Sequence, residues 1–123
     1  MAKVNLVDKR AKLDLWDIVK YQFITHCYLN KIVLSDSELD CLTLLAVNGE
    51  YDLAEFCDHA SADKIFKTTQ SVRNCIVKMD KAGFIYKTGK SKKKIFINPD
   101  LKIQAEGNIM LDFKFVHLGT QEA

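Results

Sequence analysis

Several features that would define a class of protein are scarce or absent in this sequence. Its 123 residues include one proline and five glycines, too few for a collagen-like or low-complexity chain. No apolar run approaches the roughly 20 residues that cross a bilayer, and the first residues lack the apolar core of a signal peptide. With 48% hydrophobic residues, the chain is also too apolar to remain disordered. We therefore expect one folded, cytoplasmic domain that makes no contact with a membrane.

Recognisable catalytic signatures are missing as well. The sequence contains no P-loop, no GxGxxG and no HExxH motif. Pairs of aspartates do occur, but they stand where helices are expected to begin, and there the helix dipole favours a negative charge. We expect no catalytic residue, no cofactor and no small-molecule ligand, and therefore not an enzyme. The three histidines have no Ser, Cys or carboxylate neighbour in a triad-like pattern; they are His26, His59 and His117.

Cysteine is present, but not in a metal-binding pattern. The four cysteines lie singly in apolar stretches without a CxxC pair, whereas a zinc site needs paired ligands at short spacing. The nearest approach, at residues 57–59, has the wrong spacing for a structural site. We expect no metal, and four buried free thiols in a reducing compartment. These are Cys27, Cys41, Cys57 and Cys75.

Charge is distributed very unevenly along the chain, although the net charge is only +2. Residues 64–94 contain ten basic residues and one acid, whereas the rest of the chain contains eight basic and fifteen acidic residues. A basic segment of this kind is typical of proteins that bind a phosphate backbone, but a solvated lysine-rich face would explain the charge equally well. The position of these residues in the fold has to decide between the two. The ten are Lys64, Lys67, Arg73, Lys78, Lys81, Lys87, Lys90, Lys92, Lys93 and Lys94.

The first helix is expected over residues 13–29, where large apolar side chains recur at helical spacing. Tyr21 and Tyr28 lie off the main stripe, so this helix is apolar on more than one face. Such a helix needs partners on two sides, for example its own core and a second subunit. The main stripe consists of Trp16, Val19, Phe23 and either Ile24 or Cys27.

Two further helices follow from capping patterns. Ser35 and Glu38 have the spacing of a capping box, which would open a helix that ends at residues 48–49. Asp52 repeats the signal and starts a short helix through Cys57. The residues expected on the apolar side of the first of these helices are Leu39, Leu42, Leu45 and Ala46.

The second half of the sequence predicts one more helix and two hairpins. Thr68 or Thr69 can cap a helix that runs to residue 82, with Gly83 as its left-handed stop. The period then changes to two, so residues 84–88 and 94–97 predict a hairpin that Pro99 terminates. Residues 101–106 and 109–118 predict a second hairpin. The core-facing stripe of the helix is Val72, Cys75, Ile76 and Met79, and the apolar stripe of the second hairpin is Ile109, Leu111, Phe113 and Phe115.

This order of elements resembles the winged helix-turn-helix superfamily over residues 35–98. Residues 69–86, TQSVRNCIVKMDKAGFIY, are similar to the recognition helix and first wing strand of many bacterial and phage regulators. The resemblance implies an α+β fold: a winged helix-turn-helix core with an additional N-terminal helix (1–34) and a C-terminal β-hairpin (99–123), packed as one domain. Residues 58–67 depart from the pattern, because they are longer than the usual turn, lack Gly and include an exposed-looking Ile65–Phe66. Either the second helix is extended or the turn is reshaped.

The resemblance also implies a small transcriptional regulator of phage or plasmid type that binds double-stranded DNA. The helix at 69–82 would enter the major groove, where Gln70 and Asn74 suit adenine and Arg73 suits guanine. The lysine-rich wing would lie on the neighbouring backbone. The DNA-binding residues so predicted are Thr69, Gln70, Arg73, Asn74, Lys78, Lys81, Lys90, Lys92, Lys93 and Lys94.

A second hypothesis is a structural role in a larger assembly, such as the head-to-tail connector of a tailed phage or another virion component. Winged helices also serve as protein-interaction modules, and the acidic remainder of the chain would permit head-to-tail contacts with the basic segment. Both hypotheses expect a homo-oligomer, a dimer for the regulator and a ring for the structural subunit. Five aromatic residues are assigned either to the core of the domain or to an interface between subunits: Trp16, Phe23, Tyr28, Phe113 and Phe115.

Overall fold

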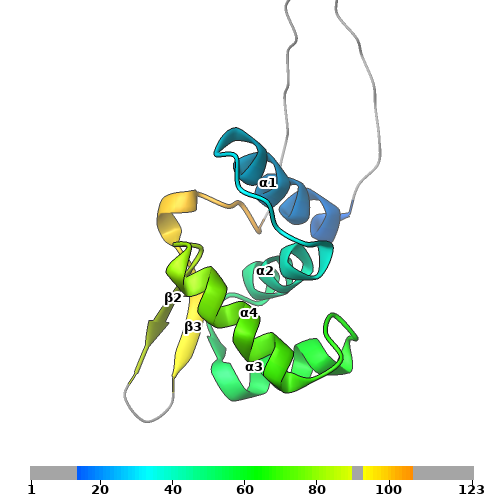
Figure 1. Cartoon of the computed structure of the whole chain (residues 1–123). Helices are drawn as coiled ribbons and strands as arrows, with labels where there is room; N and C mark the ends of the chain where they lie inside the picture. Colours follow the sequence, from blue (N-terminus) through cyan, green and yellow to red (C-terminus); the bar gives the residue numbers. More distant parts are fainter. Residues whose placement is uncertain (1–13, 90–92, 107–123) are drawn as a thin grey trace, which may run out of the picture.

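The computed structural model describes residues 14–89 and 93–106 of the chain. These residues form four α-helices, a three-stranded antiparallel sheet and one 3-10 turn (Figure 1). The α+β class predicted from the sequence is therefore confirmed. The elements are α1 (Leu15–Leu29), α2 (Asp36–Asn48), β1 (Tyr51–Asp52), α3 (Leu53–Ala62), α4 (Thr69–Lys81), β2 (Ile85–Thr88), β3 (Lys94–Ile97) and the turn η1 (Pro99–Leu101).

Each helix begins at a side chain that caps its first turn. Ser35 and Glu38 form the expected capping box of α2: Glu38 N donates to Ser35 Oγ at 3.2 Å, and Ser35 N donates to Glu38 Oε1 at 2.8 Å. Asp14, Asp52 and Thr68 each accept a backbone N–H at the start of α1, α3 and α4. The helix starts are therefore determined by local sequence.

The predicted apolar stripe of α4 is buried in the core, and the helix stops at Gly83, whose φ of 85° favours glycine. All four cysteines are buried free thiols, as predicted. On α1 the buried fourth member of the stripe is Cys27, whereas Ile24 is 40% exposed. The largest side chains of the core are Phe23, Phe56 and Phe84.

The sheet has the strand order β1-β3-β2, so the predicted hairpin of β2 and β3 gains a third strand that no sequence pattern indicated. Strand β1 pairs with β3, with Tyr51 opposite Ile95. Directly after it, Leu53 N donates to Lys93 O at 2.9 Å. The start of α3 is thereby bound to the wing strand.

The unusual segment between α3 and α4 is explained by an extended α3. The helix continues to Ala62, and Lys64 then adopts a left-handed backbone with a φ of 60°. Ile65 N donates back to Ala60 O at 3.1 Å, so the chain reverses against the end of its own helix. As a result Ile65 and Phe66 are half-buried against the core, and the expectation that they are exposed is wrong.

The chain beyond β3 differs from the predicted second hairpin. After η1, Lys102 adopts a left-handed backbone with a φ of 53°, and residues 102–105 form no strand. The side chain of Gln22 on α1 binds both backbone groups of Gln104: its Nε2 donates to Gln104 O and its Oε1 accepts from Gln104 N, each at 2.7 Å. The prediction of a strand at 101–106 is wrong, because a side chain of α1 takes the place of a neighbouring strand. Residues 109–118, which include Phe113 and Phe115, lie outside the described residues.

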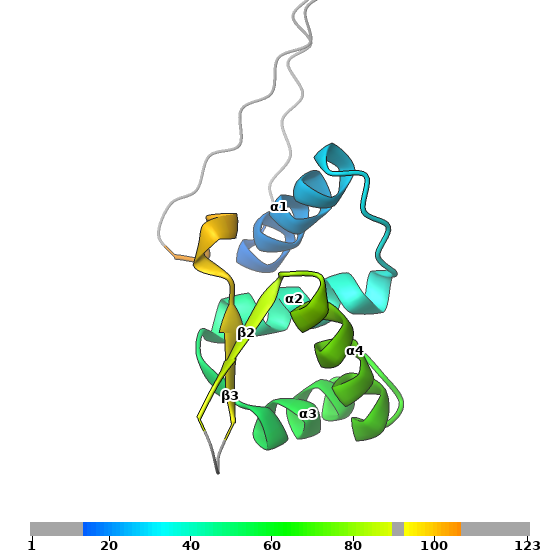
Figure 2. The same cartoon turned by 60° about the vertical axis from the view of Figure 1, so that its left-hand side comes forward.

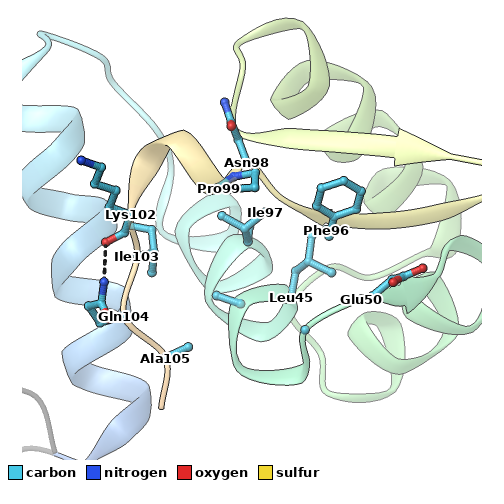
Figure 3. Close-up of a pocket in the computed structure, with 12 residues that line it drawn as sticks. Leu45, Glu50, Phe96, Ile97, Asn98, Pro99, Lys102, Ile103, Gln104 and Ala105 are labelled. Carbon is cyan, nitrogen blue, oxygen red and sulfur yellow. Dashed lines mark hydrogen bonds between the residues drawn. The ribbon is translucent and has the colours of Figure 1, made fainter. Parts of the chain in front are cut away.

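Helices α1 and α3 lie at opposite ends of the described part of the molecule, with α2 between them, in both views (Figures 1 and 2). Residues 99–105 return towards α1 and leave an open hollow of about 450 Å³ beside the end of α2 (Figure 3). Its lining is mostly apolar and includes Leu45, Phe96, Ile97 and Ile103.

Candidate nucleic-acid interface

Helix α4 exposes a polar face opposite its buried stripe. At 100° per residue, five residues of this helix cover an arc of only about 100°, and all five are exposed. In Figure 1, α4 lies in front of the other elements. We call this set the outer face of α4; it consists of Gln70, Arg73, Asn74, Val77 and Lys81.

The two amides of the outer face are hydrogen bonded to each other. Gln70 Nε2 donates to Asn74 Oδ1 at 3.0 Å across one helical turn. Within the described residues Gln70 Oε1 and Asn74 Nδ2 have no further hydrogen-bond partner. The pair therefore offers one acceptor and one donor, the combination that the N6–H and N7 edge of adenine requires.

The cations around this face are not neutralised. Arg73 and Lys81 form no ion pair with any residue in 14–89 or 93–106. Arg73 lies on the flank towards α3, where burial raises the pKa of the Cys57 thiol and the arginine charge opposes that rise. Lys64 and Lys67 precede the helix and are exposed too. The sequence analysis includes these two lysines in the basic segment 64–94 but predicts no individual role for either.

Lys78 occupies a different environment from the one predicted for it. Its Nζ lies 2.7 Å from Glu38 Oε2, and the Glu38 side chain is only 12% exposed. Burial alone would raise the pKa of Glu38, but hydrogen bonds from Lys78 and from the backbone and hydroxyl of Ser35 hold that pKa below its ordinary value. Lys78 therefore joins α4 to the start of α2. The sequence gives no direct signal of this pair, because the two residues are 40 positions apart.

The wing continues directly from α4. Asn98 fixes its base: Asn98 Nδ2 donates to Gly83 O at 2.8 Å and Asn98 N donates to Phe84 O at 2.9 Å. Lys93 and Lys94 are exposed at the start of β3, and the contact of Lys94 Nζ with Glu50 Oε1 is long, at 3.8 Å. The two other predicted wing lysines, Lys90 and Lys92, lie outside the described residues.

Acidic side chains lie on both sides of α4 and are not confined to one end of the molecule: Glu55 and Asp58 belong to the neighbouring α3, and Asp36 and Asp40 belong to α2. Lys20 of α1 sits 2.7 Å from Asp36 and 2.8 Å from Asp40 at the start of α2. Hydrogen bonds to these two carboxylates raise the pKa of Lys20, against a smaller opposing effect of burial. In the described part of residues 64–94, by contrast, eight basic residues accompany a single acid. Helix α4 and the described part of the wing are thus strongly basic, although the neighbouring α3 is acidic.

The residues proposed for an oligomer interface have different environments. Phe23 is fully buried within its own chain, so its side chain belongs to the core and is not available to a partner. Trp16 is half-buried against the core, and Tyr28 is 83% exposed. Only Tyr28 among the described candidates has a side chain that is mostly accessible.

A second polar cluster surrounds His59 of α3. His59 lies between Tyr51 and Asp63, with its Nδ1 3.0 Å from Tyr51 Oη and its Nε2 3.2 Å from an Asp63 oxygen. The contact between Tyr51 and His59 holds β1 against α3. The sequence pattern did not predict this contact. In the described residues no group of three or more His, Cys, Asp or Glu side chains could hold a metal ion. None of the helices in these ranges has the length and hydropathy of a membrane span.

Comparisons with known proteins support the fold. No protein-family model and no curated protein matches the sequence. The ferric uptake regulator Fur of Helicobacter pylori is similar in structure, with a TM-score of 0.50 and 13% sequence identity, over 91% of this chain and 75% of that chain. The structure of that regulator is described as revealing three functional metal-binding sites. At this identity the similarity shows the fold alone, and it agrees with a winged-helix fold for this chain.

Proposed function

We propose that this chain is a DNA-binding winged-helix protein that acts as a small transcriptional regulator. The single observation that carries the proposal is the outer face of α4, where two amides and two unpaired cations lie together and the wing follows directly. A solvated lysine-rich surface would need neither the amide pair nor the Arg73 side chain beside it. Helix insertion into the major groove places such residues against base edges.

Each residue of the outer face has a chemical role in this proposal. The Gln70–Asn74 pair binds the edge of an adenine through one acceptor and one donor, and Arg73 donates two hydrogen bonds to a guanine. Val77, 43% exposed at the centre of the face, contacts a thymine methyl group. Lys81, Lys64 and Lys67 bind phosphates. The contacts to base edges would give sequence preference, and the contacts to phosphates would give affinity.

The wing supplies further phosphate contacts. Lys93 and Lys94 stand at its described edge, and Lys90 and Lys92 belong to the same basic run in the sequence. Lys78 does not belong to the phosphate-binding set in this proposal, since it is bound to Glu38. Its role is to hold α4 against the start of α2 and so to fix the orientation of the outer face.

Fluorescence anisotropy of a labelled mixed-sequence duplex, titrated with protein at several salt concentrations, tests the proposal. We expect log K to fall linearly with log salt, with a slope of about −0.9 for each phosphate neutralised. Replacing Lys90, Lys92, Lys93 and Lys94 together with Ala should reduce the slope by up to about 3.6. Absence of binding at low salt would contradict the proposal, and would favour the structural hypothesis in which the basic segment faces a protein neighbour. The phage or plasmid origin of either role stays a prediction.

A further inference from the structure

Two helices pack against α4, and both of them carry acidic residues. The carboxylates at the start of α2 are each paired with a lysine: Asp36 and Asp40 with Lys20, and Glu38 with Lys78. A paired carboxylate repels a distant phosphate less than a free one does, because the lysine charge opposes it. The lysines therefore offset most of the negative charge at the start of α2.

The acidic residues on the outer side of α3 have no such partner. Glu55 and Asp58 are exposed, and neither forms an ion pair with any residue in 14–89 or 93–106. They are three positions apart and therefore lie on one side of the helix. The other side of α3, with Phe56, Cys57 and Ala60, is buried in the core. We call Glu55 and Asp58 the acidic pair of α3.

The acidic pair lies close to the outer face of α4. Helix α3 packs on α4 and lies beside it in both views (Figures 1 and 2). The charges of Arg73 and Asp58 shift the pKa of the Cys57 thiol in opposite directions, so both side chains lie near this core position. Packed helices are about 8–10 Å apart, and the Debye length is about 8 Å at physiological ionic strength. Phosphates on the α3 side of a duplex bound to the outer face are therefore repelled by the acidic pair.

We propose that the acidic pair of α3 determines how a duplex lies on this protein, because it repels the phosphate backbone from the α3 side of the outer face. This inference rests on the proposed function. Non-specific binding depends on phosphate contacts, and the acidic pair disfavours every orientation in which the backbone crosses the first two turns of α3. The favoured orientation places the backbone over Lys64 and Lys67 before α4 and over the wing after it, with the outer face against the bases. Glu55 and Asp58 thus lower non-specific affinity more than affinity for a preferred sequence, and are specificity-determining residues.

Anisotropy titrations of a labelled mixed-sequence duplex, at about 50 and 200 mM salt, test the repulsion. Glu55→Gln combined with Asp58→Asn should tighten binding about three- to tenfold at the lower salt and less at the higher salt, where the charges are screened. The matched control is Asp17→Asn combined with Glu106→Gln, which changes the net charge equally at exposed residues outside α3 and α4. It should tighten binding less than about twofold. Circular dichroism verifies that both variants remain folded.

Charge reversal measures how close the backbone comes to α3. Glu55→Lys combined with Asp58→Lys should steepen the slope of log K against log salt by up to about 1.8, since each phosphate newly neutralised adds about 0.9. Asp17→Lys combined with Glu106→Lys is the control, and it should leave the slope unchanged because these positions do not reach the duplex.

Selection from a randomised duplex library tests the role in specificity. The duplex enriched by the original chain and the mixed-sequence duplex are both titrated, and the ratio of their Kd values measures the preference. The variant with Glu55→Gln and Asp58→Asn should show a preference at least about twofold lower than that of the original chain. The control variant with Asp17→Asn and Glu106→Gln should show an unchanged preference.

The outcomes distinguish this proposal from the proposed function. If the original chain binds the duplex but the neutralised acidic pair binds no tighter than its control, or its lysine variant leaves the slope unchanged, the backbone does not pass near α3 and this proposal alone is refuted. An unchanged preference in the neutralised variant, or enrichment of no sequence by the original chain, would refute the role in specificity. Absence of duplex binding at low salt would refute the proposed function and this inference together.

Discussion

The ion pair between Lys78 and Glu38 should stabilise the fold by an amount that a double-mutant cycle can measure. Lys78 Nζ is 2.7 Å from Glu38 Oε2, with the lysine side chain 56% exposed and the glutamate side chain 12% exposed. Exposed pairs contribute about 0.2–1 kcal/mol, and the burial of the carboxylate places this pair near the upper limit. Glu38→Gln removes the charge and retains the capping side chain, because Gln serves in a capping box as Glu does. We therefore expect Glu38→Gln and Lys78→Met each to lower the free energy of unfolding by about 1 kcal/mol.

The assay is urea denaturation of the original chain, both single variants and the double variant. If the pair accounts for the loss, the double variant should be no less stable than either single variant, with a coupling energy of about 1 kcal/mol. Additive losses, with a coupling energy near zero, would refute the assignment of Lys78 to Glu38. Lys78 would then be available for a phosphate after all.

The pH dependence of the same pair provides an independent sign test. The pKa of Glu38 is lower in the folded chain than its ordinary value of 4.5. The stability that ionised Glu38 contributes is therefore fully present above that ordinary value, and it is lost as the pH falls through the lower folded value. The stability difference between the original chain and Glu38→Gln should stay constant from neutral pH down to the ordinary value and then shrink. A difference that grows on acidification would contradict this account.

Two further predictions concern the core and the wing. The thiols should react with Ellman's reagent at least about 100-fold more slowly in the native chain than in urea, because all four are buried. Burial raises the pKa of Cys27 and Cys57, and a hydrogen bond to Cys75 together with burial raises that of Cys41. Rapid reaction of the native protein would show that the helices open readily. Asn98→Ala should cost about 1–2 kcal/mol of unfolding free energy in thermal denaturation, since it removes two hydrogen bonds: from Asn98 Nδ2 to Gly83 O, and from Asp100 N to Asn98 Oδ1. A loss below about 0.3 kcal/mol would mean that the base of the wing is held by other contacts.

The elements predicted most accurately are those determined by short-range physics. The Ser35–Glu38 capping box and the stop at Gly83 each involve residues at most a few positions apart, so their geometry is determined by local sequence. The buried stripe of α4 was predictable for the same reason, because helical spacing alone brings its residues together. Even the reshaped turn after α3 was indicated by its length, although its left-handed residue, Lys64, was not.

The features that the sequence could not reveal depend on distant partners. Strand β1 has two residues, too few to show alternation, and it exists because β3 pairs with it. The backbone of Gln104 is bound by Gln22, 82 positions away, which is why an alternating pattern at 101–106 did not become a strand. Lys78 is exposed on its own helix, and only the packing of α4 on α2 brings it to Glu38. For the candidate site, the composition of the outer face was predictable, but the ion pair that binds Lys78 to Glu38 was not.

The measurement that tests the central claim most directly is the salt dependence of DNA binding for three matched lysine variants. Anisotropy titrations would compare Lys81→Ala on the outer face, Lys78→Ala beside Glu38, and Lys102→Ala, an exposed lysine beyond the wing. If the outer face of α4 lies against DNA, Lys81→Ala should reduce the slope of log K against log salt by about 0.9, and the other two variants should leave the slope unchanged. Equal slopes for all three variants, or no binding by the original chain, would contradict the account.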